Sequence, residues 1–185
     1  MQRNRLIAAV LLLIQAFSTT ATDLDAPFRQ ALLKELNNRT LASQVVSALA
    51  DTHKGTPQGD FWRAYSELEA HQWPLYAEQA TAYELSPGGF FLSLKARASI
   101  LFAKAWPNRF VDMLSQATKA YAAELAALTP PTAQQEFWRY VIAQEQVQVV
   151  AFQHAAKQDY VAATAVIDSF IRSNHGAHLQ GGPRL

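Results

Sequence analysis

Cysteine is missing from the whole chain of 185 residues. Disulfide bonds therefore cannot hold this protein together, and no lipid can be attached through a cysteine at a processed N-terminus. A chain of this length can fold without such bridges, because a domain of roughly 150 residues buries about two thirds of its surface. We expect one domain that depends on its own hydrophobic core.

The motifs of the common enzyme and metal-binding classes are also missing. The chain has no His-Glu-x-x-His pair, no Glu-x-x-His of the di-iron bundles and no Gly-x-Ser-x-Gly turn of the hydrolases. Phosphate-binding loops and dinucleotide fingerprints are absent too. We therefore predict no cofactor and no metal, and we favour a non-catalytic protein over an enzyme.

The chain has no large excess of positive or negative charge, since it contains 16 Lys and Arg and 15 Asp and Glu, with a formal net charge of +1. No part of the chain gathers Lys and Arg into a basic cluster. Because a nucleic-acid partner needs a basic face that neutralises phosphates, we expect no nucleic-acid binding.

The N-terminus has the pattern of a secretory signal peptide. Arg3 and Arg5 precede the apolar run Leu6 to Phe17, and small residues end the segment at Ala21. The run is shorter than the roughly 20 residues that span a bilayer, although an uncleaved anchor remains the alternative. We predict a signal peptide over 1–21 and a periplasmic or secreted mature protein. No later segment is long and apolar enough for stable membrane insertion.

Apolar residues recur at helical spacing through the rest of the chain, and no stretch alternates with period two. This pattern predicts an all-α fold, either an irregular multi-helix bundle or a short stack of helical hairpins, with about seven helices. The predicted domain covers residues 22–174. Residues 175–185 contain Gly and Pro and are expected to form a flexible tail.

Helix boundaries follow from capping residues and helix breakers. Asp25 before Pro27 predicts a helix start, and Asn37-Asn38 predicts an interruption between two short helices. Asp60 is expected to cap the next helix, and Pro74 to kink or break it. Further helices are predicted over 90–106, 110–128, 136–156 and 160–173, with Asp159 as the last cap and with Phe91, Leu94, Ile100, Leu101 and Ala105 available for burial.

A short internal repeat connects two of these helices. Asp60-Phe61-Trp62-Arg63 matches Glu136-Phe137-Trp138-Arg139, and the same alignment places Glu69 opposite Glu145. The repeat predicts two related helices whose Trp62 and Trp138 lie in similar environments, in the first turn and against the core.

Each repeat also predicts a binding surface. Adjacent residues of a helix point about 100° apart, so two large neighbouring rings do not easily bury against one neighbour. One ring of each pair could face a partner, because Trp, Tyr and Arg are favoured anchors of protein interfaces. A helix packed on two sides is the alternative. The candidate binding residues are Phe61, Trp62, Arg63, Phe137, Trp138 and Arg139.

Glu69 and Glu145 are the candidate catalytic residues of an alternative interpretation. Both lie on helical stripes with aromatic and aliphatic neighbours, where desolvation raises the pKa of a carboxyl group. If the two helices pack together, the pair could serve a carboxylate-based hydrolase or bind a metal. The competing interpretation is that each carboxylate reaches solvent or accepts a hydrogen bond from a neighbouring helix.

Three functional interpretations follow from these patterns. The first is an exported protein-binding module, of adaptor, inhibitor or immunity type, that engages a protein partner outside the cytoplasm. The second is the hydrolase or metal-binding protein that uses Glu69 and Glu145. The third is a carrier of a small ligand in an apolar pocket between helices.

Overall fold

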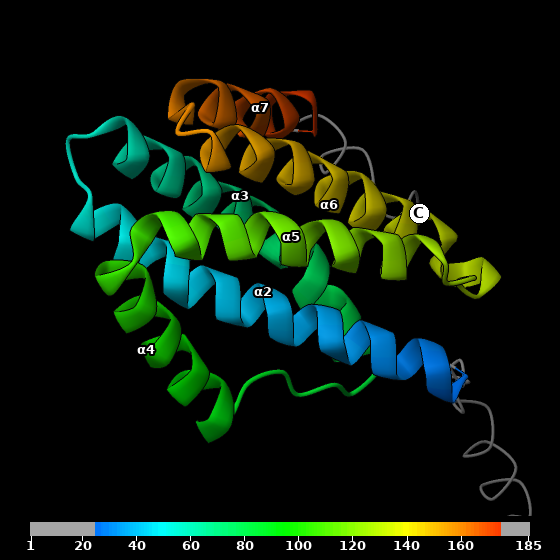
Figure 1. Cartoon of the computed structure of the whole chain (residues 1–185). Coiled ribbons are helices and arrows are strands. Elements are labelled where there is room, and N and C mark those ends of the chain that lie inside the picture. Colours follow the sequence, from blue (N-terminus) through cyan, green and yellow to red (C-terminus); the bar gives the residue numbers. More distant parts are fainter. Residues whose placement is uncertain (1–24, 175–185) are drawn as a thin grey trace, which may run out of the picture.

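The computed structural model describes residues 25–174, and its regular structure is helical (Figure 1). In chain order the elements are α2 (Ala26–Thr52), α3 (Pro57–Ala82), α4 (Phe90–Ala105), α5 (Pro107–Ala126), the 3-10 turn η1 (Thr132–Gln134), α6 (Gln135–Ala156) and α7 (Tyr160–Asn174). No strand occurs within 25–174, so the predicted all-α class is confirmed, with six α-helices there where about seven were predicted. The predicted signal peptide over 1–21 and the tail over 175–185 lie outside the described residues.

Two of the three predicted helix caps are present. The Asp25 side chain accepts a hydrogen bond from the backbone N–H of Phe28 at 2.9 Å, and Asp159 accepts one from Ala162 at 3.1 Å. The third prediction is wrong, because the helix expected to begin at Asp60 begins earlier, where Thr56 caps Pro57–Ala82. Asp60 instead lies in the first turn, where a carboxylate is favourable beside the unpaired backbone N–H groups.

The interruption predicted at Asn37-Asn38 is wrong, and of the kink or break predicted at Pro74 the break is wrong. Helix α2 runs through Asn37-Asn38 without a break, and the Asn37 side chain accepts a hydrogen bond from the backbone N–H of Gly88 at 2.8 Å. Helix α3 likewise continues through Pro74. A proline inside a helix removes one backbone hydrogen bond, and packing on both sides of the proline is sufficient here to keep the helix continuous.

Helices α3 and α6 cross the interior in opposite directions. Contacts between them pair Phe61 with Phe152, Tyr65 with Gln148 and Tyr76 with Phe137. Residues later in α3 thus contact residues earlier in α6, so the two helices are antiparallel. The two repeats of the sequence therefore begin at opposite ends of the core, and their centres meet in the middle.

The core consists of two apolar clusters with a polar layer between them. One cluster gathers around Trp62 and Phe152, and the other around Phe28 and Trp138. Trp62 and Trp138 are each 1% exposed, one in each cluster, as the repeat predicts. Between the clusters, the middle turns of α2, α3 and α6 bury the polar residues Glu35, Arg39, Glu69, Gln72, Gln144, Glu145 and Gln148.

Helix α4 crosses one end of the molecule and contacts α2 and α5 (Figure 1). Only its two small residues Ala96 and Ala103 are buried. Phe91, Leu94 and Leu101 were predicted to be available for burial, and the structure exposes them instead. The predicted helical period is correct, but Ala96 and Ala103 form the buried face, and of the predicted residues Ile100 packs against the core.

Candidate functional site

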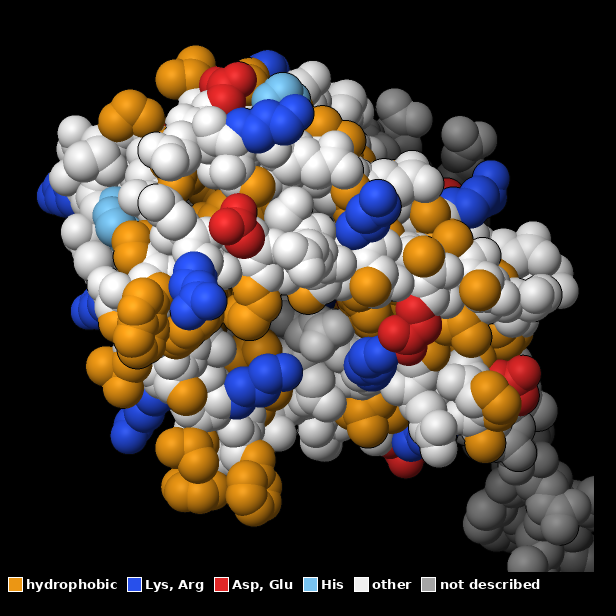
Figure 2. Space-filling model, viewed as in Figure 1, with side chains coloured by type: hydrophobic (Ala, Val, Ile, Leu, Met, Phe, Trp, Pro, Cys, Tyr) orange, Lys and Arg blue, Asp and Glu red, His pale blue; other side chains and the backbone are white. Residues whose placement is uncertain are grey.

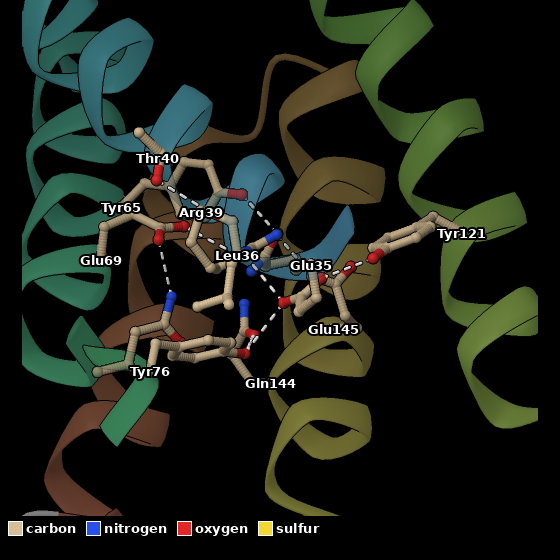
Figure 3. Close-up of polar contacts among 12 residues, drawn as sticks. Glu35, Leu36, Arg39, Thr40, Tyr65, Glu69, Tyr76, Tyr121, Gln144 and Glu145 are labelled. Carbon is tan, nitrogen blue, oxygen red and sulfur yellow. Dashed lines mark hydrogen bonds and ion pairs between the residues drawn. The ribbon is translucent and has the colours of Figure 1, made fainter. Parts of the chain in front are cut away.

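Arg39 of α2 stands at the centre of the polar layer and contacts a carboxylate from each of three helices (Figure 3). Its Nη1 donates to Oε1 of Glu69 at 2.9 Å, and its Nη2 donates to Oε1 of Glu145 at 2.7 Å. Its Nε lies 3.1 Å from Oε1 of Glu35, an ion pair without hydrogen-bond geometry. We call Arg39, Glu35, Glu69 and Glu145 the Arg39 cluster.

Neutral side chains complete the hydrogen bonding of two carboxylates. Tyr121 donates to Oε2 of Glu35 at 2.8 Å, and Gln72 donates to Oε2 of Glu69 at 2.8 Å. The Tyr76 hydroxyl lies 3.0 Å from Oε1 of Glu35 and 3.1 Å from Oε1 of Gln144, and its single proton serves one acceptor at a time. Glu145 differs, because Oε2 of Glu145 accepts no hydrogen bond from residues 25–174.

The Arg39 cluster holds more negative than positive groups. Three buried carboxyls face one guanidinium, which leaves two formal negative charges in excess if all are ionised. Burial raises the pKa of Glu69 to about 7 against the opposing effect of Arg39. Burial likewise raises the pKa of Glu145 to about 8, and the neighbouring Glu35 and Glu69 add to the increase. Protonation near neutral pH therefore removes part of the excess charge.

Arg39 itself stays protonated and positively charged. Burial alone lowers the pKa of a guanidinium, but Glu69, Glu35 and Glu145 together raise the pKa of Arg39 well above its ordinary value. An arginine keeps its proton at any pH at which the protein is folded. The cluster is consequently a constant positive charge among three carboxyls, and burial raises the pKa of two of them, Glu69 and Glu145, to near neutrality.

The alternative interpretation of the sequence paired Glu69 with Glu145, and in the structure the two carboxyls do lie together. Glu69 and Glu145, separated along the chain, both bind the same guanidinium. Sequence reasoning missed Glu35 and Arg39, which lie one helical turn apart on α2. Their spacing and their apolar neighbours Leu32 and Leu36 were a usable signal. The predicted interruption at Asn37-Asn38 placed them in different segments and obscured it.

The candidate binding residues divide into buried rings and exposed arginines. Phe61, Trp62, Phe137 and Trp138 are core residues, so the alternative of a helix packed on more than one side describes their position. Arg63 is exposed and pairs with Asp60 at 2.8 Å and with Glu67 at 3.7 Å. Arg139 is exposed too, and its Nε donates to the backbone carbonyl of Gln135 at 3.3 Å.

A cavity of about 300 Å³ adjoins the Arg39 cluster and lies between α2 and α5. Its polar end is lined by Asn38, Arg39, Thr118, Tyr121 and Glu145, and its apolar end by Val45, Val46, Trp62, Phe110, Leu114 and Phe152. Lys95 and Ser99 of α4 also line it. Figure 2 shows this face of the molecule, with a hollow between the two helices and Lys and Arg side chains around it. Glu145 lines the cavity, whereas Glu69 does not.

Metal binding has no support in the described part of the chain, where no three His, Cys, Asp or Glu side chains are placed to share an ion. None of the helices within 25–174 is long and apolar enough to cross a membrane. No protein-family model matches this chain, and neither a curated protein nor a solved structure matches it.

Proposed function

We propose that this protein is an exported, non-catalytic binding protein that engages a protein partner outside the cytoplasm. The observation that carries the proposal is the surface of α4. Phe90 is 77% exposed and Phe91 83%, and Leu94, Leu101 and Trp106 are each more than half exposed. Apolar side chains that gather on one surface element are typical of an interaction site.

Three of the exposed large apolar residues of α4 share one side of the helix. At about 100° per residue, Phe90, Leu94 and Leu101 fall within one narrow stripe, and Phe91 borders it. Ala96 and Ala103 lie on the opposite side, which is the side that contacts the rest of the molecule. We call Phe90, Phe91, Leu94, Leu101 and Trp106 the α4 face. Burying this face against a partner would remove from water the apolar area that folding leaves exposed.

Charge around the α4 face indicates the character of the partner. Helix α4 contains Lys95, Arg97 and Lys104 and no acidic residue. Aromatic residues with basic residues at their edge match the composition of protein interfaces, and an acidic rim on the partner would complement them. Met113 of α5 is exposed as well and lies beyond the helix stripe. We therefore propose a partner with an apolar groove and an acidic rim.

This proposal keeps the binding function predicted from sequence but assigns it to the α4 face instead of the two Phe-Trp-Arg sets. The rings of the two Phe-Trp pairs stabilise the core, so they are not available to a partner without unfolding. Arg63 and Arg139 remain exposed, and their participation stays a prediction. Adaptor, inhibitor and immunity-type roles all fit a binding protein of this kind.

Photo-crosslinking in the exported fraction of a Gram-negative host, followed by mass spectrometry, tests the proposal. A variant with Phe90→Ser, Phe91→Ser and Leu101→Ser should lose the crosslinked partner while its melting temperature stays unchanged. Val150→Ser with Val161→Ser is the matched control, because both valines are exposed outside α4. Retention of the partner by the α4 variant would reject the proposal, as would binding to anionic lipid vesicles with no protein crosslinked.

A carboxylate-based hydrolase is the second candidate function. Two observations favour it: Glu69 and Glu145 both accept hydrogen bonds from Arg39, and the pKa of both carboxyls is raised. Only Glu145 lines the cavity, so a substrate there would meet one carboxyl and not two. A hydrolytic activity that Glu69→Gln with Glu145→Gln abolishes in a folded protein would establish this candidate in place of a binding protein.

A further inference from the structure

The cavity beside the Arg39 cluster has the size and lining of a small-molecule site. Its volume of about 300 Å³ lies at the lower end of the range of such pockets, roughly 300–1,000 Å³. Five helices line it, and most of the lining is apolar or aromatic. It has a polar end and an apolar end, so an amphipathic molecule fits it in one orientation.

Two cavity-lining residues each have one polar atom without a hydrogen-bond partner within residues 25–174. Glu145 is 1% exposed, and only its Oε1 is engaged by Arg39, so Oε2 is an open acceptor. Gln148 is similarly buried, and no side chain or backbone group within 25–174 accepts from its Nε2. Buried polar groups are normally hydrogen-bonded, so the open Oε2 of Glu145 on the cavity wall is an acceptor that a ligand would satisfy.

Charge decides which kind of head group fits. The buried carboxyls of Glu35, Glu69 and Glu145 outnumber the one buried guanidinium, so the single positive charge of Arg39 does not balance them when all three are ionised. Lys95 at the edge of the cavity is exposed, and water screens its charge far more than that of a buried group. Tyr65 and Tyr121 also line the cavity, and aromatic rings attract cations.

We propose that this cavity binds a small organic cation, an amine on an aromatic or aliphatic body, with its ammonium group against Oε2 of Glu145 and its body at the apolar end. The bound ammonium group supplies the positive charge that the Arg39 cluster lacks. The proposal concerns a different surface from the α4 face and does not depend on it. None of the residues of the α4 face lines the cavity.

Proton release follows from the same arrangement. A cation at Glu145 stabilises its ionised form. The other titratable or charged groups around the site are Arg39 and Glu35 of α2, Tyr65, Glu69 and Tyr76 of α3, Lys95 of α4 and Tyr121 of α5. Because the pKa of Glu145 is raised to about 8 in the free protein, binding at pH 7 should displace a proton into solvent.

Isothermal titration of the full mature chain with three matched probes tests the proposal. The probes are 2-phenylethylamine, its neutral analogue 2-phenylethanol and the anion 3-phenylpropionate. We expect the amine to bind at least tenfold more tightly than the alcohol, and the anion to bind most weakly. Titration of the amine at pH 7 in buffers of different ionisation enthalpy should show release of up to about one proton.

Four variants locate the binding. Glu145→Gln should weaken amine binding at least tenfold, and Ala42→Phe should abolish it because Ala42 is a half-buried residue of the cavity wall. Glu67→Gln is the control, an exposed carboxyl of the same helix as Glu69, and should leave binding unchanged. Lys95→Ala should leave binding equal or tighter.

Several results would overturn the proposal. They are equal or tighter binding of the alcohol or the anion, no binding of the amine at millimolar concentration, or unchanged amine binding by Ala42→Phe. If Glu145→Gln does not fold, the comparison of the three probes and the Ala42→Phe variant still decide whether the cavity binds an organic cation. Loss of the crosslinked partner in the α4 variant with normal amine binding would show that the two sites are separate.

Discussion

The centre of the core and the surface of α4 reverse the usual distribution of polar and apolar residues. The middle of α2, α3 and α6 buries an arginine, three glutamates and several glutamines. Helix α4 exposes two phenylalanines, two leucines and the tryptophan that follows it. The reversal shows that residue type alone does not decide burial, because the decisive question is which helix faces are brought together.

The two regions also differ in how they contribute to stability. Burying ions costs free energy, which the hydrogen bonds of the Arg39 cluster offset only while every member has its partner. The α4 face has the opposite character, since its side chains contribute little to folding and remain available for binding. We therefore expect substitutions in the Arg39 cluster to change stability and substitutions in the α4 face to change interactions.

The largest effect is expected from Arg39→Met. Removing the guanidinium leaves three buried carboxyls without a counter-charge, which should lower the free energy of unfolding by about 3–5 kcal/mol at pH 8. The loss should shrink at pH 5, where Glu69 and Glu145 hold protons. Chemical denaturation at both pH values measures it, with the exposed Arg63→Met as control. A loss below about 1 kcal/mol at pH 8 would contradict the central role of Arg39.

The next effect is a dependence of stability on pH. The pKa values of Glu69 and Glu145 are raised in the folded protein from 4.5 to about 7 and about 8. The folded state therefore holds more protons than the unfolded state between those values, and stability falls as pH rises from about 4.5 to about 8. The total change should be on the order of a few kcal/mol.

Thermal unfolding between pH 4.5 and 8.5 checks this dependence. The double variant Glu69→Gln and Glu145→Gln is the control, because it keeps acceptors for Arg39 but removes both titrating groups. Its melting temperature should vary much less over this interval than that of the unaltered protein. Parallel curves for the two proteins would show that these carboxyls do not titrate near neutrality.

The smallest effect on stability is expected at the α4 face. Phe91→Ala removes a ring that is 83% exposed, and it should change the free energy of unfolding by no more than about 0.5 kcal/mol. The same denaturation experiment measures it. A loss above about 2 kcal/mol would show that the ring is buried in solution and would erase the contrast with the core.

Sequence patterns predicted much of the fold and part of the site. The helical period and the Asp25 and Asp159 caps were readable from neighbouring residues. The repeat predicted Trp62 and Trp138 against the core, although both were also candidate binding residues, and the structure buries both. The alignment of the two repeats also paired Glu69 with Glu145. Their shared partner Arg39 was not found, because it lies 30 residues from Glu69 and 106 residues from Glu145 in the chain.

The sequence by itself determined that the described chain is helical, where most helices begin and which residues share a helix face. Those properties depend on contacts within a few residues, so a local pattern records them. Only the tertiary structure decided that polar stripes of three helices meet around Arg39, and that α4 buries Ala96 and Ala103 while Phe90 and Phe91 are exposed. A helix can turn any face to its neighbours, and the burial of every other surface selects the face that meets the core.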